Sequence, residues 1–239
     1  MVVLALDTTT SSGSCALARD GHVVCEQVNA RPNAHAELLP GDLMTLIDRA
    51  STRLRDVDVF AVATGPGSFT GLRIGIATMQ GLAFAEGKPL VGVSGFEALA
   101  RVATDTVPRR SPDDRRHVAT WVDAWRGEVF AALYEDGREV QTPVVSRPES
   151  LLDSLRGWST LFIGDGALVH RETIRSLLGE LAWFAGPTAP PLAGTIALLA
   201  GGELLAGGAD ARQHPPHAIR PLYIRRTDAE LARDARSLG

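Results

Sequence analysis

Apolar and polar residues follow two different periods along this chain of 239 residues. Runs in which apolar residues dominate or alternate predict β-strands, and apolar residues spaced three or four apart predict amphipathic helices. The Asp20-Gly21 pair between the second and third runs is typical of a hairpin turn. In the first half of the chain, the pattern predicts strands at residues 2–6, 14–18, 22–28, 57–63 and 90–93 and helices at 36–50, 70–85 and 95–103.

The same pattern begins again after a polar stretch at residues 104–116 that contains proline. Asp7 and Asp123 are 116 residues apart, and the pairs Ala16-Leu17 and Asp20-Gly21 recur at the same offset. Three matches at one offset favour duplication of an α/β unit over chance. The second copy continues with helices at 149–155, 167–178 and 192–206 and strands at 160–164 and 181–184.

We therefore expect four regions: an N-terminal lobe at residues 1–103, a linker at 104–116, a C-terminal lobe at 117–226 and a flexible tail at 227–239. Each lobe should be a mixed five-stranded sheet flanked by helices. Two such lobes resemble the actin/Hsp70/hexokinase (ribonuclease H-like) architecture. In that superfamily the hairpin after the first strand holds nucleotide phosphate, and its leading aspartate handles the metal and the attacking water. The matching residues here are Asp7, Thr8 and Thr9.

A glycine-rich turn follows the strand at 57–63. Gly65-Pro66-Gly67 precedes a helix that Ser68 can cap, and a strand, a glycine turn and a helix N-terminus together form an anion site. The spacing differs from that of a Walker A loop and of a dinucleotide fingerprint. The candidate phosphate loop comprises Asp7, Thr8, Thr9, Gly65, Gly67 and Ser68. The alternative is that the hydroxyls of residues 7–13 form a polar turn and cap backbone groups.

Composition and short motifs narrow the chemistry further. The net charge of −4 and a pI near 5.9 give the chain no global basic field that would attract nucleic acid. Lys88 is the only lysine, which removes most candidates for a Schiff-base residue. The chain has no His-Glu-x-x-His, His-x-x-x-His or Gly-x-Ser-x-Gly, so we expect neither a metal site nor a serine triad.

The cysteines and the apolar stretches predict where the protein acts. In a regular two-residue hairpin Cys15 faces Glu26, and Cys25 faces Ala16, which puts the two thiols on opposite faces and disfavours a disulfide. The first apolar run lacks the basic segment that precedes a signal peptide. The apolar stretch at 192–208 contains Glu203 and several glycines, so it predicts a buried helix. We expect a cytoplasmic protein without a membrane span.

Small residues are frequent in the predicted helix at 70–85. Gly71, Gly75 and Gly81 all fall inside it, and a glycine inside a helix costs about 1 kcal/mol relative to alanine. Close approach of another backbone would offset this cost. That backbone belongs either to the same domain or to another chain, and the sequence leaves both open.

Several motifs together resemble the TsaB (YeaZ) family over nearly the whole chain. Gly65–Gly75 is the most specific of them. The others are Leu4–Thr8, His35-x-x-x-Leu39-Pro40, Gly81–Ala83, Asp123-Ala124, Gly127–Val129, Gly164–Gly166 and Pro221–Arg225. One departure is that family members commonly have Asp-Ala-Arg where this chain has Asp123-Ala124-Trp125.

The resemblance implies a catalytically silent dimerisation subunit of the bacterial complex that threonylcarbamoylates the adenosine beside the anticodon of ANN-decoding tRNAs. It implies a TsaD-type transferase as partner, a TsaE-type ATPase in the complex, a homodimer when the protein is alone, and tRNA contact through the complex. The chain itself then requires no cofactor, and ATP or ADP with Mg²⁺ acts at the level of the complex. The implied interface lies on the first two helices, at His35, Leu39, Leu43, Leu46, Gly71, Arg73, Gly75 and Thr78.

Two other functions stay open at this point. An ATP-dependent phosphotransferase or acyltransferase of the same architecture is favoured by Asp7 and its hydroxyl-rich turn, and disfavoured by the missing metal ligands. A glycoprotease-type metallopeptidase is disfavoured by the lack of a paired-histidine ligand set.

Overall fold

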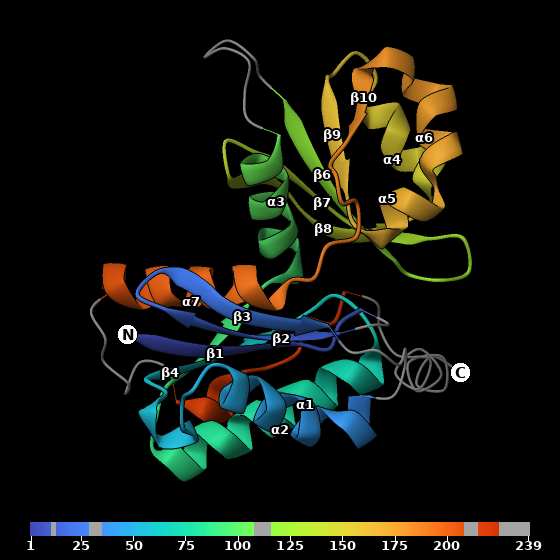
Figure 1. Ribbon diagram of the computed structural model, residues 1–239. Coiled ribbons are helices and arrows are strands. Elements are labelled where there is room, and N and C mark those ends of the chain that lie inside the picture. Colours follow the sequence, from blue (N-terminus) through green and yellow to red (C-terminus); the bar gives the residue numbers. More distant parts are fainter. Residues whose placement is uncertain (11–12, 29–34, 108–115, 208–214, 225–239) are drawn as a thin grey trace, which may run out of the picture.

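The computed structural model describes residues 1–10, 13–28, 35–107, 116–207 and 215–224, which fold into two lobes, each built on one five-stranded sheet (Figure 1). The first sheet has the order β3-β2-β1-β4-β5 and the second has the order β8-β7-β6-β9-β10. The first sheet consists of β1 (Val2–Asp7), β2 (Ser14–Arg19), β3 (His22–Val28), β4 (Val59–Ala63) and β5 (Leu90–Val93). The second consists of β6 (His117–Asp123), β7 (Val129–Glu135), β8 (Arg138–Ser146), β9 (Thr160–Ile163) and β10 (Ala182–Phe184).

The two sheets have the same topology, which confirms the predicted duplication. In each sheet the first three strands are antiparallel neighbours, and the last two are added in parallel beside the first strand. The fold is therefore the expected duplicated, actin-like α/β architecture.

Helices cover both faces of each sheet. They are α1 (His35–Arg49), α2 (Phe69–Glu86), α3 (Gly95–Thr106), α4 (Pro148–Ser154), α5 (Asp165–Val169), α6 (Arg171–Leu178) and α7 (Ala193–Gly207), with short 3₁₀ turns η1 (Leu54–Asp56), η2 (Gly179–Leu181) and η4 (Pro216–Ala218). The single helix predicted at 167–178 is in fact α5 and α6, which meet at His170, where the backbone leaves the helical region at ψ 20°. Within the described part of the chain, no helix is both long and apolar enough to cross a membrane.

The last helix of each repeat packs on the sheet of the other repeat. Helix α7 lies on β1, β2, β3 and β4 of the first sheet, whereas α3 lies on β6, β7 and β9 of the second (Figure 1). The N-terminus of α7 is fixed there because the Ala193 amide donates to Ser14 Oγ at 3.1 Å and the Gly194 amide to Glu26 Oε1 at 2.8 Å. The first sheet is therefore covered by a helix from the second repeat, and the second sheet by a helix from the first.

The described apolar residues form three buried clusters, one between the lobes and one on the outer face of each sheet. The cluster between the lobes joins α3 and α7 to alternate residues of both sheets. The outer cluster of the first sheet packs α1 and α2 on β1 and β4, and includes Leu39, Leu43 and Leu46. The outer cluster of the second sheet packs α4, α5 and α6 around Trp121 and Phe162. Helices α1 and α2 thus lie side by side on the face of the first sheet that is remote from the second lobe (Figure 1).

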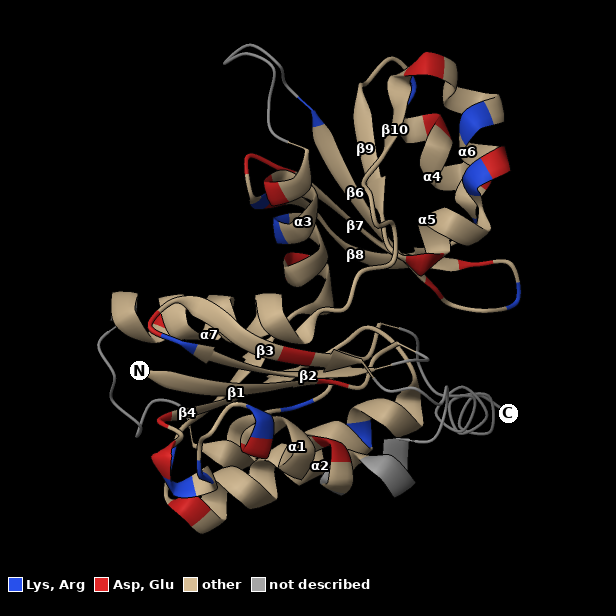
Figure 2. Ribbon diagram, in the orientation of Figure 1, with Lys and Arg blue, Asp and Glu red and all other residues tan. Residues whose placement is uncertain are grey.

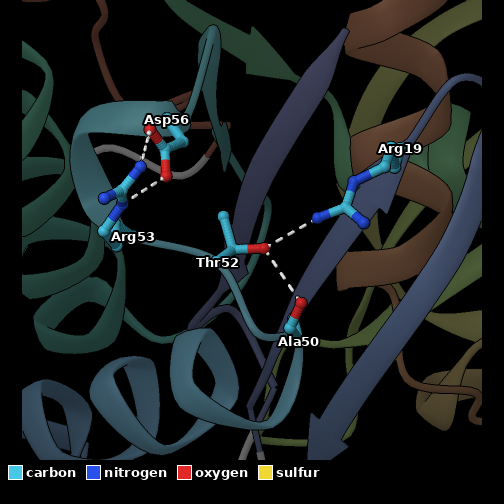
Figure 3. A network of polar contacts seen from close by, with 5 residues as sticks. All are labelled: Arg19, Ala50, Thr52, Arg53 and Asp56. Carbon is cyan, nitrogen blue, oxygen red and sulfur yellow. Dashed lines mark hydrogen bonds and ion pairs between the residues drawn. The ribbon is translucent and has the colours of Figure 1, made fainter.

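Polar contacts tie the connection after α1 to the first hairpin. The Arg19 guanidinium donates to Thr52 Oγ1 at 2.8 Å, and the Thr52 hydroxyl donates to the Ala50 carbonyl at 3.0 Å. Arg53 and Asp56 form an ion pair across η1 at 2.8 Å (Figure 3). Charged residues of both signs are spread over both lobes, in agreement with the slightly acidic composition (Figure 2).

The hairpin of β2 and β3 departs from the predicted register. Arg19 pairs with His22 as expected, but an irregularity between Leu17 and Ala18 shifts the rest of β3 by one residue. Cys25 therefore pairs with Leu17, and both thiols lie on the face that packs under α1. The prediction of opposite faces was wrong because the bulge reverses the alternation of β3. Both cysteines are free thiols, and burial raises the pKa of Cys15 to about 12.

Candidate functional site

The turn after β1 holds the residues that the sequence pointed to as a phosphate loop. Asp7 ends β1 and is only 1% exposed. Its Oδ1 accepts hydrogen bonds from the Thr9 amide at 2.8 Å and from the Thr9 hydroxyl at 2.6 Å. Thr8 is also buried, and its hydroxyl donates to the Gly71 carbonyl at 2.8 Å. These polar groups are thus used inside the chain, in the manner of the capped polar turn.

The N-terminus of α2 packs directly on this turn. Ser68 caps the helix, since its Oγ accepts from the Gly71 amide at 3.2 Å, and the Ser68 amide donates to the Thr9 carbonyl at 3.0 Å. A Cβ atom at Gly67 would lie 2.3 Å from the Thr9 carbonyl oxygen, and one at Gly71 would lie 2.2 Å from that of Thr8. Only glycine fits at either position. Two amides at this helix start, those of Ser68 and Gly71, thus already donate to oxygen atoms of the chain.

Gly65 belongs to the same packed turn. Its φ is +115°, a region that favours glycine, and its carbonyl accepts from the Gly95 amide at 2.8 Å. The turn therefore joins β4 to the start of α3, which is the helix that crosses to the second lobe. The structure brings together all six residues of the candidate phosphate loop, as a packed joint between β1, β4, α2 and α3.

A cavity of about 170 Å³ lies beside this joint, between the lobes. Its lining is drawn from both repeats and comprises Thr9, Thr10, Gly13, Val28, Pro66, Gly95, Leu99, Val122, Gly164, Asp165, Ala189, Pro190, Pro191 and Leu192. Pockets for ligands of drug size usually measure roughly 300–1,000 Å³. The one charged residue among these lining residues is Asp165, and none of them is basic.

The charge and size of this cavity disagree with the nucleotide and Mg²⁺ that the fold family implies. Asp165 Oδ1 accepts from the Asp123 and Gly166 amides at 2.9 Å each, and burial raises the pKa of this carboxyl. A buried carboxylate without a neighbouring cation repels phosphate oxygens. Among the described residues, no group of three or more His, Cys, Asp and Glu side chains is placed to hold a metal ion. These residues do not fit a magnesium nucleotide.

The counterpart turn of the second repeat carries an exposed tryptophan. Trp125 and Arg126 both have φ of +56°, and the Trp125 amide donates to Asp123 Oδ1 at 3.0 Å. Trp125 therefore projects from a tight left-handed turn, at the position where the related family commonly has arginine.

The eight predicted interface residues fall into three groups. Leu39, Leu43 and Leu46 are buried in the core under α1. Gly71 and Gly75 are buried against Thr8, whose Oγ1 would lie 2.2 Å from a Cβ at Gly75. Within the chain, α1 and α2 use these five residues to pack on their own sheet. Arg73 is exposed, Thr78 is half-buried, and the side chain of His35 lies outside the described part.

Sequence reasoning missed the residues that α1 and α2 do expose. Phe84 of α2 is 82% exposed and Met44 of α1 is 55% exposed. Gly81 lies on the outer side of α2, and a Cβ there would meet nothing within 4 Å. We call Met44, Ala77, Gly81 and Phe84 the α1–α2 face. The signal in the sequence was the spacing of Ala77, Gly81 and Phe84 on a side of the helix that Leu72, Ile76 and Met79 do not occupy.

Comparison with known proteins gives one consistent result. The family model described as TsaD, tRNA N6-adenosine threonylcarbamoyltransferase, matches residues 19–233. The tRNA threonylcarbamoyladenosine biosynthesis protein TsaB of Escherichia coli is 34% identical over 181 residues, which make up 69% of this chain and 72% of that protein. An uncharacterized protein of Mycobacterium leprae, ML0378, is 35% identical over 152 residues; these are 62% of this chain but only 39% of that longer protein.

A solved structure agrees with these relatives over almost the full length. It is a protein of Pseudomonas aeruginosa described as similar to the peptidase YeaZ, and it superposes with a TM-score of 0.72 at 30% identity. The match covers 94% of this chain and 99% of the other. The chain belongs to the TsaB (YeaZ) family, within the wider group of proteins that the TsaD family model describes.

Proposed function

We propose that this protein is a non-catalytic subunit required for threonylcarbamoylation of the adenosine next to the anticodon in ANN-decoding tRNAs. It acts by binding a TsaD-type transferase. Family membership supports the pathway, since the E. coli relative is named for threonylcarbamoyladenosine biosynthesis. The observation that carries the binding role is the α1–α2 face, where apolar side chains are exposed on two adjacent helices.

The α1–α2 face has features that the fold alone does not require. Phe84 of α2 and Met44 of α1 are both exposed, and exposed large apolar side chains on two adjacent helices support a protein interface. Gly81 lowers the stability of α2 by about 1 kcal/mol relative to alanine, and no described residue lies against it to offset the cost. A partner helix that approaches closely at Gly81 would supply that compensation. The same face pairs two copies of the protein as a homodimer when the transferase is absent.

The packed joint around Asp7 supports a scaffold role over an ATP-dependent phosphotransferase or acyltransferase. In such an enzyme the turn after β1 must be open to phosphate and metal. Here Thr8 and Thr9 are buried and bonded to Gly71 and Asp7. ATP or ADP with Mg²⁺ then acts at the level of the complex, through a TsaE-type ATPase. tRNA reaches this subunit through the complex. The protein then acts in the cytoplasm, together with the tRNA that the complex modifies.

The test is threonylcarbamoyl transfer to tRNA by cognate TsaD-type and TsaE-type proteins, with and without this protein, at matched ATP and threonylcarbamoyl-adenylate. We expect modification only when this chain is present and none from this chain alone. Phe84→Glu should abolish both transferase binding and modification, because it places a charge on the apolar face. Leu205→Glu is the matched control, since Leu205 is an apolar residue of α7 that is 75% exposed away from α1 and α2.

Three results would contradict the proposal. Full modification without this protein would remove the need for the subunit. Normal binding by Phe84→Glu would place the interface elsewhere. Hydrolysis of ATP by the isolated protein would favour the enzymatic alternative.

A further inference from the structure

An arginine on the outer side of α2 is held by two aromatic side chains. The Arg73 guanidinium lies 3.9 Å above the centroid of the Phe69 ring, one helical turn earlier. Its Nε donates to the Tyr223 hydroxyl at 3.0 Å. The two rings lie 5.4 Å apart, centroid to centroid. We call Phe69, Arg73 and Tyr223 the arginine clamp.

Tyr223 reaches this position on a segment that is itself anchored. Residues 215–224 run along α2, on the face of the first sheet opposite to α7. Gln80 Nε2 donates to the Pro216 carbonyl at 2.9 Å and to that of Ile219 at 3.2 Å. The Leu222 amide donates to the Thr64 carbonyl at 2.7 Å, next to Tyr223. The tyrosine hydroxyl is therefore held at a fixed place beside Arg73.

The clamp is too exposed to be explained by the stability of the fold. Phe69 is 41% exposed and Tyr223 is 45% exposed, so water screens both contacts with the cation. Restricting an arginine side chain also costs conformational entropy. The result is a pre-oriented cation on the surface. Because Nε already donates to Tyr223, the terminal Nη1 and Nη2 groups, which have no partner among the described residues, remain as an end-on fork.

We propose that the arginine clamp binds a carboxylate of the partner protein that covers the α1–α2 face; this rests on the function proposed above. Phe69, Arg73, Ala77, Gly81 and Phe84 follow one another along α2 at intervals of three or four residues. They therefore lie on one side of the helix, and the clamp extends the α1–α2 face toward the N-terminus of α2. An end-on guanidinium fork matches the two oxygens of one carboxylate, and pre-orientation reduces the entropy lost on binding.

A carboxylate fits this site better than the phosphates of RNA. Binding to a nucleic acid backbone generally uses several cations together. Arg73 is the only basic residue of α2. The nearby Arg220 donates to the backbone carbonyls of His217 and Ile219 in its own segment. Among the described residues, the clamp therefore offers a single guanidinium with aromatic neighbours, which is typical of a protein interface, where arginine and aromatic residues carry much of the affinity.

The experiment is a calorimetric titration of the full-length protein with the TsaD-type partner, using Phe84→Glu and four further variants. Arg73→Gln should weaken binding about 30-fold, because the partner carboxylate loses its counter-charge. Arg73→Lys should lose most of the same affinity, since a lysine has no fork and cannot keep the Nε bond. Tyr223→Phe should weaken binding about threefold through loss of orientation alone. Arg101→Gln is the control, because Arg101 is an exposed arginine of α3, ion-paired with Asp105 at 2.8 Å.

The outcomes separate this inference from the function on which it rests. If Phe84→Glu abolishes binding while Arg73→Gln and Tyr223→Phe bind like the original protein, the clamp has no role and only this inference is wrong. If Phe84→Glu also binds normally, the proposed interface itself is wrong. If Arg73→Gln binds the partner normally but lowers affinity for tRNA in a filter assay, the occupant is a phosphate and the proposal is overturned. Unchanged far-UV circular dichroism confirms that each variant is folded.

Discussion

Replacing Gly75 by alanine tests the packed joint most directly. Gly75 lies in the second turn of α2, over the turn that follows β1. A Cβ there would lie 2.2 Å from Thr8 Oγ1 and 3.2 Å from both Thr8 Cβ and Cγ2. Thr8 cannot retreat easily, because it is 1% exposed, its branched side chain has few rotamers, and its hydroxyl is bonded to the Gly71 carbonyl at 2.8 Å.

The expected change in the free energy of unfolding combines one stabilising and two destabilising contributions. Alanine in place of glycine stabilises a helix by about 1 kcal/mol. Forcing an extra methyl group into a packed core costs about 1–3 kcal/mol. Displacing the Thr8 hydroxyl so that it is buried without a partner costs about 1–3 kcal/mol more. The net change is a loss of about 1–5 kcal/mol in the free energy of unfolding, so the steric and hydrogen-bond terms exceed the helix propensity.

Gly81→Ala provides the control on the same helix. It makes the same chemical change where a Cβ meets nothing within 4 Å, so it should raise the free energy of unfolding by about 0.5–1 kcal/mol. Urea denaturation measures both variants, and thermal melting should show shifts of opposite sign, about 2–4 °C per kcal/mol for a chain of this size.

A double variant isolates the contact itself. Thr8→Ala removes the atoms that the new methyl group would strike, so Gly75→Ala should cost much less in that background. The coupling between the two changes should exceed about 1 kcal/mol. If Gly75→Ala stabilises the protein as Gly81→Ala does, or if the coupling is zero, Gly75 does not pack closely on Thr8 and the reasoning is refuted.

Two other predictions concern half-buried carboxylates that accept hydrogen bonds from helix amides. Glu26→Ala should lower the free energy of unfolding by about 1–2 kcal/mol, because the carboxylate accepts from the Gly194 amide at 2.8 Å and faces the positive end of α7. Urea denaturation measures this change. A change smaller than the error of the fit would contradict the prediction. Asp165→Asn should gain stability relative to the original protein as pH rises. Burial raises the folded-state pKa of Asp165, so the folded protein holds that proton more tightly than the unfolded chain does. The original protein therefore loses stability as the pH rises from the ordinary pKa to the raised one, and the asparagine variant does not. Unfolding curves at pH 3 and pH 7 test it, and a difference that stays constant with pH would refute it.

The strand pattern and the repeat were enough to predict the fold, because alternation and turn residues are local signals. The offset between Asp7 and Asp123 predicted two equivalent sheets, and both have the same strand order. The exchange of α3 and α7 between the sheets was not predictable in this way. It depends on contacts such as that of Gly194 with Glu26, which are 168 residues apart in the sequence. The bulge between Leu17 and Ala18 was missed because no glycine or proline marks it.

The interface residues illustrate a limit of reading surfaces from apolar periodicity. Leu39, Leu43 and Leu46 stand out in the sequence because they recur on one side of a helix, and that same regularity is what buries them in the lobe. Residues that contact a partner must lie on the complementary side, where they interrupt the polar pattern. Phe84 and Gly81 do so: Phe84 is 82% exposed, and no described residue lies within 4 Å of a Cβ placed at Gly81. If the proposed interface holds, α2 shows its core in its apolar period and its partner surface in the residues that interrupt that period.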